Sequence, residues 1–289
     1  DRGVTQALAT HPGIRSVDFT GSNVFGQWLI DHCKQAQVYA ELAGVNNIVI
    51  DSTDAYKAML GNLAFTLSLY SGQMCTTTQA IFVPAGGIDT DEGHKSYDEV
   101  CADLGAAITR FLSKPEVACA VLGAIQSDAT QGRIELANSG ALGRVVLASQ
   151  SIANAEFPDA AVRTPVLLAC DAADESAYME ERFGPISFVV KVADTAAGIA
   201  LSERVVREHG ALTVGLYSTR DEVIDAMTAA TWRGKVALSI NLTSGVFVNQ
   251  SSAYSDYHGT GGNPSANASY SDSAFVANRF RVVQRRRHV

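Results

Sequence analysis

The chain has 289 residues, of which 47% are apolar and 18% charged, with a formal net charge of −8. This length and apolar content are enough to bury one large core or two smaller ones, and they exclude a disordered chain. The negative charge argues against the clustered basic surface of a nucleic-acid-binding domain. No apolar run approaches the roughly 20 residues of a membrane-spanning helix, so we expect no membrane partner.

The five cysteines are scattered and include no CxxC pair. A disulfide framework or a zinc site is therefore not indicated, and a cytoplasmic location fits best. The six histidines form no spaced cluster, so no metal site is predicted. The N-terminus does not resemble a signal peptide and lacks an initiator methionine, so we expect a processed or truncated chain.

Strands and helices are predicted to alternate along the chain. Short apolar runs predict strands, and apolar residues at helical spacing predict amphipathic helices. The strands are expected at 13–19 (after a turn), 47–50, 80–83, 144–148, 166–169, 186–192, 212–218 and 236–241, and the helices at 24–35, 54–70, 96–112, 127–137, 195–208 and 221–231. Asp51, Ser52 and Asp54 are the candidate N-caps of the helix at 54–70. This order predicts an α/β fold with a mostly parallel sheet covered by helices on both faces.

The C-terminal part of the chain has a different composition. Residues 250–273 are rich in Ser, Gly, Asn and Tyr and predict a long ordered loop. Apolar and polar residues alternate along 275–286 well enough to predict a terminal strand. The basic run at 285–287 is interpreted as the solvated end of that strand.

Three short glycine-containing segments carry candidate chemistry: FTGS at 19–22, ELAG at 41–44 and GQMC at 72–75. Cys75 is a potential nucleophile, because a cysteine thiolate attacks carbonyl carbons once it is ionised. Glu41 is a potential base, because a carboxylate close to an acyl-enzyme can activate water for its release. The pair predicts covalent catalysis on a carbonyl carbon. Taken singly, Cys75 is a buried structural thiol and Glu41 a solvated side chain.

Together with ERFGP at 181–185, these segments resemble the motifs of the aldehyde dehydrogenase superfamily in order and spacing. The resemblance implies the C-terminal part of a Rossmann-like cofactor-binding domain at 1–42, a catalytic domain at 43–262 and a tail with an oligomerisation strand at 263–289. It therefore implies a homo-oligomer, a dimer or larger. The variant ELAGVNN at 41–47 is similar to the PaaN-type enzymes of bacterial phenylacetate degradation.

The resemblance also implies the catalytic roles. Cys75 attacks the aldehyde to give a thiohemiacetal, hydride leaves to NAD or NADP, and Glu41 activates the water that hydrolyses the resulting thioester. The backbone N–H of Cys75 helps to stabilise the oxyanion. The implied substrate is a small aldehyde and, for the narrower resemblance, a semialdehyde carried as a CoA thioester.

Five further positions are implied to bind the cofactor. Gly21 and Ser22 lie where a pyrophosphate meets a helix N-terminus, although Ser22 is equally suited to be an ordinary N-cap. The backbone of Leu42 lies beside the nicotinamide, Glu181 holds the nicotinamide ribose, and Phe183 packs next to it. Without the motif, Glu181 is interpreted as half of a solvated acidic pair with Glu180.

The sequence departs from the family pattern in three respects. Val45 stands where the family usually has a lysine, and SAYSDYHG at 252–259 replaces a PFGG-type element. The resemblance covers only the later half of the family's length. The asparagine that completes the family's oxyanion hole and the lysine that contacts the adenosine ribose are not in the part covered. We therefore expect no turnover from this chain alone. Two alternatives stay open: a CoA-acylating enzyme, disfavoured by Glu41, and a non-catalytic binding or assembly subunit.

Overall fold

The computed structural model describes residues 2–243, 245–246, 259–268 and 284–288. Its main body is an eight-stranded sheet whose neighbours are all parallel except the pair of β11 and β8. The strand order is β15 (Arg285–Arg287), β14 (Ala237–Ile240), β13 (Thr213–Tyr217), β3 (Asn47–Ile50), β5 (Ala80–Pro84), β12 (Ile186–Val192), β11 (Val166–Asp171) and β8 (Arg144–Leu147). This confirms the α/β fold with a mostly parallel sheet.

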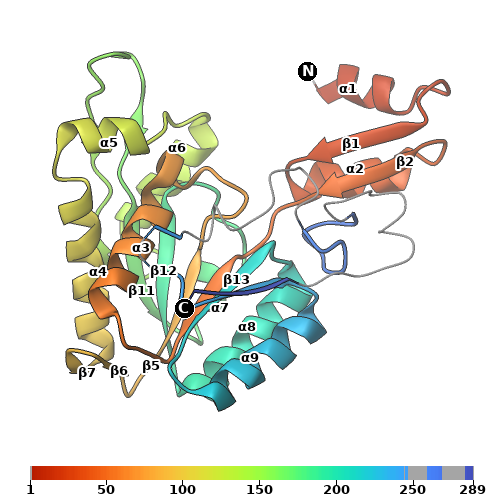
Figure 1. Cartoon of the computed structure of the whole chain (residues 1–289). Helices are drawn as coiled ribbons and strands as arrows, with labels where there is room; N and C mark the ends of the chain where they lie inside the picture. Colours follow the sequence, from red (N-terminus) through yellow and green to blue (C-terminus); the bar gives the residue numbers. More distant parts are fainter. Residues whose placement is uncertain (1, 244, 247–258, 269–283, 289) are drawn as a thin grey trace.

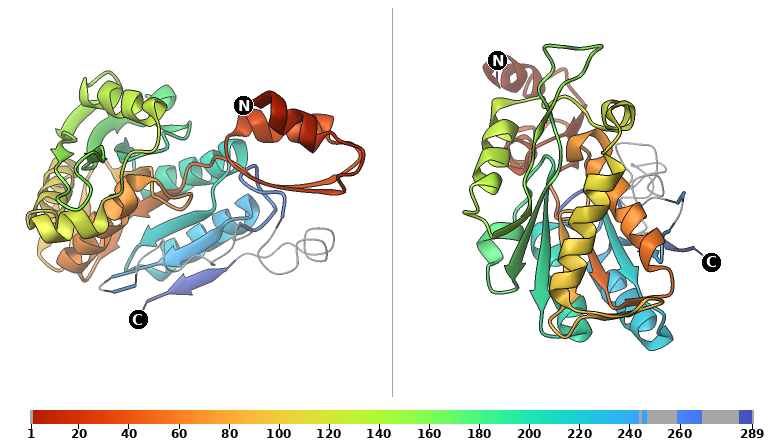
Figure 2. Two further views of the ribbon diagram at one scale, coloured as in Figure 1. Left: turned by 90° about the horizontal axis from the view of Figure 1, so that it is seen from above. Right: turned by 90° about the vertical axis from the view of Figure 1, so that its left-hand side faces the viewer.

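Helices cover both faces of this sheet (Figures 1 and 2). One face packs against α3 (Tyr56–Ser68) and α4 (Tyr97–Phe111). The other packs against α6 (Asp128–Asn138), α7 (Glu175–Tyr178), α8 (Thr195–His209) and α9 (Asp221–Gly234). Successive side chains of a strand point to opposite faces, so Ile48 and Ile50 join the first core while Val49 joins the second. Continuous apolar strands are what burial on both faces requires.

Smaller elements surround the main sheet. They are β4 (Ser52–Thr53), the 3-10 turn η1 (Leu69–Gly72), β6 (Ile88–Thr90), β7 (Gly93–Lys95), α5 (Pro115–Val121), β9 (Ser151–Ile152) and β10 (Val162–Arg163). β4, β6 and β7 form a three-stranded sheet, and β9 pairs with β10.

The N-terminal residues form a unit with a sheet and a core of their own, set to one side of the main body (Figure 1). It consists of α1 (Arg2–Ala9), β1 (Ser16–Thr20), α2 (Asn23–His32) and β2 (Gln37–Glu41), with β1 and β2 parallel. Asn267 fastens the free edge of β2, because its side-chain oxygen accepts from Ala40 N at 2.8 Å and its own N–H donates to Ala40 O at 3.1 Å.

Local sequence signals explain several element boundaries. Ser96 starts α4 with a capping box, in which its hydroxyl accepts from Glu99 N while the Glu99 carboxylate accepts from Ser96 N. Ser127 caps α6 in the same way through Thr130 N. The predicted helices at 96–112 and 127–137 are thus confirmed to within about one residue.

The predicted cap of α3 was wrong. The N-cap is Ala55, which has no side-chain hydrogen bond, and the first N–H of the helix donates instead to Asp91 at 2.8 Å. Asp51 is committed elsewhere, to a buried cluster with Arg220, Thr195 and Ser218. Burial raises the pKa of Asp51, but the hydrogen bonds from these three residues outweigh it and hold the pKa below its usual value.

The prediction missed α1 and β2, as well as α7 and the smaller elements that surround the main sheet. Most of the predicted loop at 250–273 and strand at 275–286 lies outside the described residues. Of that strand, β15 is seen pairing parallel with β14, with Arg285 and Arg287 exposed to solvent as a solvated strand end requires.

Candidate active site

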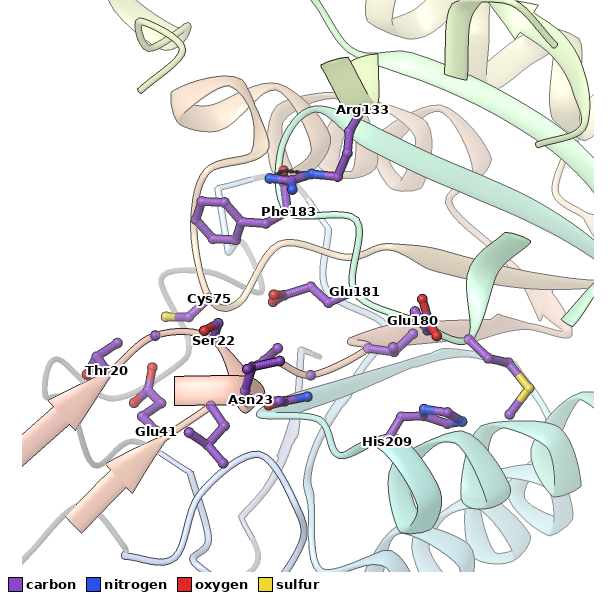
Figure 3. A pocket seen from close by; sticks show the side chains of 17 residues that line it. Thr20, Ser22, Asn23, Glu41, Cys75, Arg133, Glu180, Glu181, Phe183 and His209 are labelled. Atoms are coloured by element: carbon purple, nitrogen blue, oxygen red, sulfur yellow. Dashed lines mark hydrogen bonds between the residues drawn. The ribbon is translucent and has the colours of Figure 1, made fainter. Parts of the chain in front are cut away.

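A cleft of about 670 Å³ lies between the N-terminal unit and the amino-terminal ends of the main strands. This volume falls in the usual range for small-molecule and cofactor sites. All seven predicted site residues line it: Gly21, Ser22, Glu41, Leu42, Cys75, Glu181 and Phe183. Figure 3 shows the labelled side chains around the hollow, with Cys75, Glu41 and Ser22 close together and His209 at the other end.

Cys75 lies on the loop that joins α3 to β5. The side-chain amide of Asn46 donates to Cys75 O at 2.7 Å and to Thr77 O at 3.1 Å. Asn46 also accepts from the backbone of Leu212 and Thr213 through its oxygen, so one buried amide ties the loop to the start of β13. The backbone on the C-terminal side of the thiol is therefore tied to the sheet.

Glu41 ends β2, and its side chain is buried at 3% exposure. The carboxylate lies beside Cys75, hydrogen-bonded to the thiol. Burial raises the pKa of Cys75 to about 12, with the negative charge of Glu41, its hydrogen bond and the charge of Glu181 adding to the effect. The resting state is thus a thiol next to a carboxylate that can accept its proton.

Glu181 reaches the same cleft from the segment between α7 and β12. Burial raises its pKa, while the N–H of Gly44 and the charge of Arg133 oppose the rise. Arg133 also donates to the carbonyl oxygen of Phe183, from Nε at 3.2 Å and from Nη2 at 3.0 Å. Phe183 itself is 37% exposed at the mouth of the cleft.

Ser22 is the N-cap of α2 and accepts from Phe25 N at 3.5 Å. Gly21 and Ser22 are exposed at the start of this ten-residue helix, where first-turn N–H groups favour an anion. Leu42 follows β2, and its N–H donates to Ser265 O at 2.6 Å. The first-turn N–H groups of α2 and the half-buried carboxylate of Glu181 suit the phosphates and ribose hydroxyls of a dinucleotide.

Sequence reasoning missed several residues of the cleft. Arg133, His209 and Met179 line it from α6, the end of α8 and the segment after α7. None belongs to a motif, and the contact that brings Arg133 to the cleft, with Phe183 O, spans 50 residues of the chain. Of the departures noted above, Val45 is buried at 1% exposure, while SAYSDYHG lies almost wholly outside the described residues.

Metal-binding clusters and membrane-spanning helices are both absent from the part of the chain that the structure describes. Among these residues no group of three or more His, Cys, Asp or Glu side chains could hold a metal ion. None of the helices described is long and apolar enough to cross a membrane.

Comparison with known proteins identifies the family. The profile of the aldehyde dehydrogenase family matches residues 1–257, and the chain therefore belongs to this family. An NAD-dependent aldehyde dehydrogenase from Burkholderia multivorans has 54% sequence identity and a TM-score of 0.90 over 96% of this chain and 50% of its own.

Two curated relatives are more distant. The N-succinylglutamate 5-semialdehyde dehydrogenase of Pseudomonas fluorescens is 31% identical over 67% of this chain and 39% of its own length. The NADP-linked succinate-semialdehyde dehydrogenase of Deinococcus radiodurans is 27% identical over 69% of this chain and 40% of its own. The chain thus spans half or less of the length of these relatives.

Proposed function

We propose that the protein to which this chain belongs oxidises an aldehyde to a carboxylic acid with NAD or NADP. The observation that carries the proposal is the pairing of Cys75 with Glu41 in one buried cleft of an aldehyde dehydrogenase fold. The nearest alternative for each residue taken singly, a structural thiol or a solvated glutamate, explains neither the shared cleft nor the contact between them.

The geometry gives each residue a step. Glu41 takes the proton of the Cys75 thiol, and the thiolate adds to the aldehyde carbon. The N–H of Cys75 stabilises the oxyanion that forms on the aldehyde oxygen. When bound, the nicotinamide cofactor supplies the acceptor for the hydride that leaves this carbon. Glu41 next releases the thiol proton to solvent. The regenerated carboxylate then removes a proton from water, whose oxygen adds to the thioester carbon and displaces the Cys75 thiolate.

The residues present fit a dinucleotide. Gly21 and Ser22 offer the start of α2 to the pyrophosphate, and the backbone at Leu42 flanks the nicotinamide. Glu181 would accept hydrogen bonds from the hydroxyls of the nicotinamide ribose, and Phe183 would pack beside that ribose. Both cofactors are kept in the proposal because the relatives include an NAD-dependent enzyme and an NADP-linked one.

The buried Glu41 favours a free acid as the product. A CoA-acylating enzyme needs no base to activate water, so that alternative leaves the contact between Glu41 and Cys75 without a purpose. A non-catalytic subunit would likewise have no use for a thiol aimed at a carboxylate.

The finer substrate proposal rests on ELAGVNN at 41–47 alone. We take the substrate to be a semialdehyde linked to CoA and formed in phenylacetate breakdown. We further propose that 1–42 belong to a cofactor domain, 43–262 to the catalytic domain and 263–289 to a tail that pairs subunits of a cytoplasmic homo-oligomer.

The test uses the protein expressed from the natural start of its gene. Reduction of NAD and NADP is followed with semialdehydes, with and without coenzyme A, beside a Cys75→Ala control. Turnover without coenzyme A that disappears in the control supports the proposal. A requirement for coenzyme A would replace it with the acylating alternative, and activity in Cys75→Ala would overturn it.

A further inference from the structure

The loop that precedes Cys75 has an uncommon backbone. Tyr70 (φ 51°, ψ 31°), Ser71 (φ 52°, ψ 45°) and Gly72 (φ 63°) follow one another in the left-handed region. For a residue with a Cβ atom this conformation costs roughly 1–2 kcal/mol. It persists only where the surrounding structure holds it in place. Contacts from elsewhere in the fold must therefore set the course of the chain toward Cys75.

Ser71 makes the first of these contacts. Its side chain is fully buried, and the hydroxyl lies 2.9 Å from Gly123 O and 2.8 Å from Arg163 O. One proton is shared between two carbonyls that are 52 and 92 residues away in the chain. Gly123 also lies flat against Tyr70, since a Cβ atom added to this glycine would be 3.0 Å from Tyr70 O.

Gln73 holds the same loop from its other end. Its amide nitrogen donates to Ala124 O at 2.8 Å and to Tyr70 O at 3.2 Å. Its amide oxygen accepts from Gln126 N at 3.0 Å. The segment 123–126, which leads into α6, therefore contacts the loop on both sides of Gly72.

Gly72 faces the opposite wall. A Cβ atom at this position would be 2.4 Å from Gly184 O and 2.8 Å from the Cα atom of Pro185. The loop is thus wedged between segment 123–126 and the end of the segment that carries Glu181. A shift of the loop in either direction meets backbone atoms.

We infer that Ser71 is a positioning residue for the nucleophile: by fastening the left-handed loop to Gly123 and Arg163, its hydroxyl keeps the Cys75 thiol against the Glu41 carboxylate. Ser71 contacts neither the thiol nor the cleft, so it acts through the course of the backbone. Gln73 supports the same geometry. This inference rests on the proposed role of Cys75.

Removal of the hydroxyl leaves two part-buried carbonyls without this donor and takes away one of the contacts that hold the loop in its left-handed course. The thiol then moves away from Glu41 and toward solvent. Both changes ease ionisation of the thiol, because burial and the Glu41 charge are the two main effects that oppose it. A thiolate alkylates and a thiol does not, so the loosened loop makes Cys75 more reactive.

The test is the rate of alkylation of Cys75 by iodoacetamide between pH 6 and 10 in this chain, followed by mass spectrometry of the Cys75 peptide. Ser71→Ala and Ser71→Gly are compared with the parent and with Ser202→Ala. Ser202 is the matched control, because it is similarly buried and its hydroxyl, on α8, donates to Asn47 Oδ1 of β3 at 2.5 Å. Ser71→Gly removes the hydroxyl without left-handed strain, and so separates the two effects.

Both Ser71 variants are expected to react about tenfold faster at pH 8 and to shift the profile to lower pH, with Ser202→Ala unchanged. A parental profile in Ser71→Gly would overturn the inference, because the hydroxyl would then be only structural. If Ser71→Ala does not fold, Gln73→Ala gives the same comparison. The readout needs no aldehyde or cofactor, so failure here is separate from failure of the proposed oxidation.

Discussion

Replacement of Glu41 by glutamine tests how the carboxylate controls the thiol. With its pKa at about 12, the Cys75 thiol is ionised in on the order of 1 molecule in 10,000 at pH 8. Glu41→Gln keeps the size of the side chain but removes the charge and the acceptor that together oppose ionisation. Burial, the largest cause, remains, so the pKa is expected to fall without reaching the ordinary value of 9.0. A fall of one pKa unit raises the thiolate fraction about tenfold.

The assay is again the alkylation of Cys75 as a function of pH. We expect an increase of about tenfold at pH 8 in Glu41→Gln. Glu180→Gln is the matched control, because Glu180 lines the same cleft and is not among the groups that raise the pKa of Cys75. An unchanged reaction in Glu41→Gln would refute the placement of the carboxylate against the thiol.

Three further substitutions have defined outcomes. Gly72→Ala forces a Cβ atom into a backbone contact at φ 63°, so it should lower the free energy of unfolding in urea by about 2 kcal/mol. The control is Gly61→Ala, in the middle of α3 with open space around it, which should raise the free energy of unfolding by about 0.5–1 kcal/mol. Asp51→Asn should lose about 2 kcal/mol of stability at pH 7. This loss should shrink as the pH falls below about 4, because the parent carboxyl then binds a proton in the unfolded chain while its lowered pKa keeps it ionised in the folded one; an equal loss at pH 3 would contradict this. Arg133→Met removes a charge that lowers the pKa of Glu181, so this pKa should rise further above its normal value. Fluorescence titration of NAD(P) with the complete enzyme should show binding about tenfold weaker, and on acidification the binding should be lost at a higher pH than in the parent. A parental pH profile would count against this role of Arg133.

Much of the main sheet could be predicted because its signals are local. Strands such as β3 and β12 are continuous apolar runs, and their predicted bounds match the structure residue for residue. The start of α3 could not be predicted, because its first N–H donates to Asp91, which lies 35 residues further along the chain. β2 is short, mixed in polarity and completed by Asn267, which is 227 residues from Ala40, so no local pattern marks it.

In the candidate site too, residues with a local sequence signal could be predicted, and residues placed by long-range contacts could not. The motifs predicted that Cys75, Glu41 and Glu181 would share one cleft, and the structure brings them together. Arg133 and Ser71 were not predicted, because the contacts that place them, with Phe183 O and Gly123 O, are made to backbone carbonyls at least 50 residues away in the chain. Side chains that bind backbone leave no chemical pattern in the sequence, and only the folded chain shows what they hold.

The most direct test of the account is whether Cys75 forms a thioester that Glu41 then hydrolyses. This can be measured in the present chain with p-nitrophenyl acetate, by release of nitrophenol and by mass spectrometry of the intact protein. We predict slow turnover without an adduct in the parent, a burst with acetylated Cys75 that accumulates in Glu41→Gln, and neither in Cys75→Ala. A burst that persists in Cys75→Ala, or an adduct on another residue, would contradict the assignment of the nucleophile.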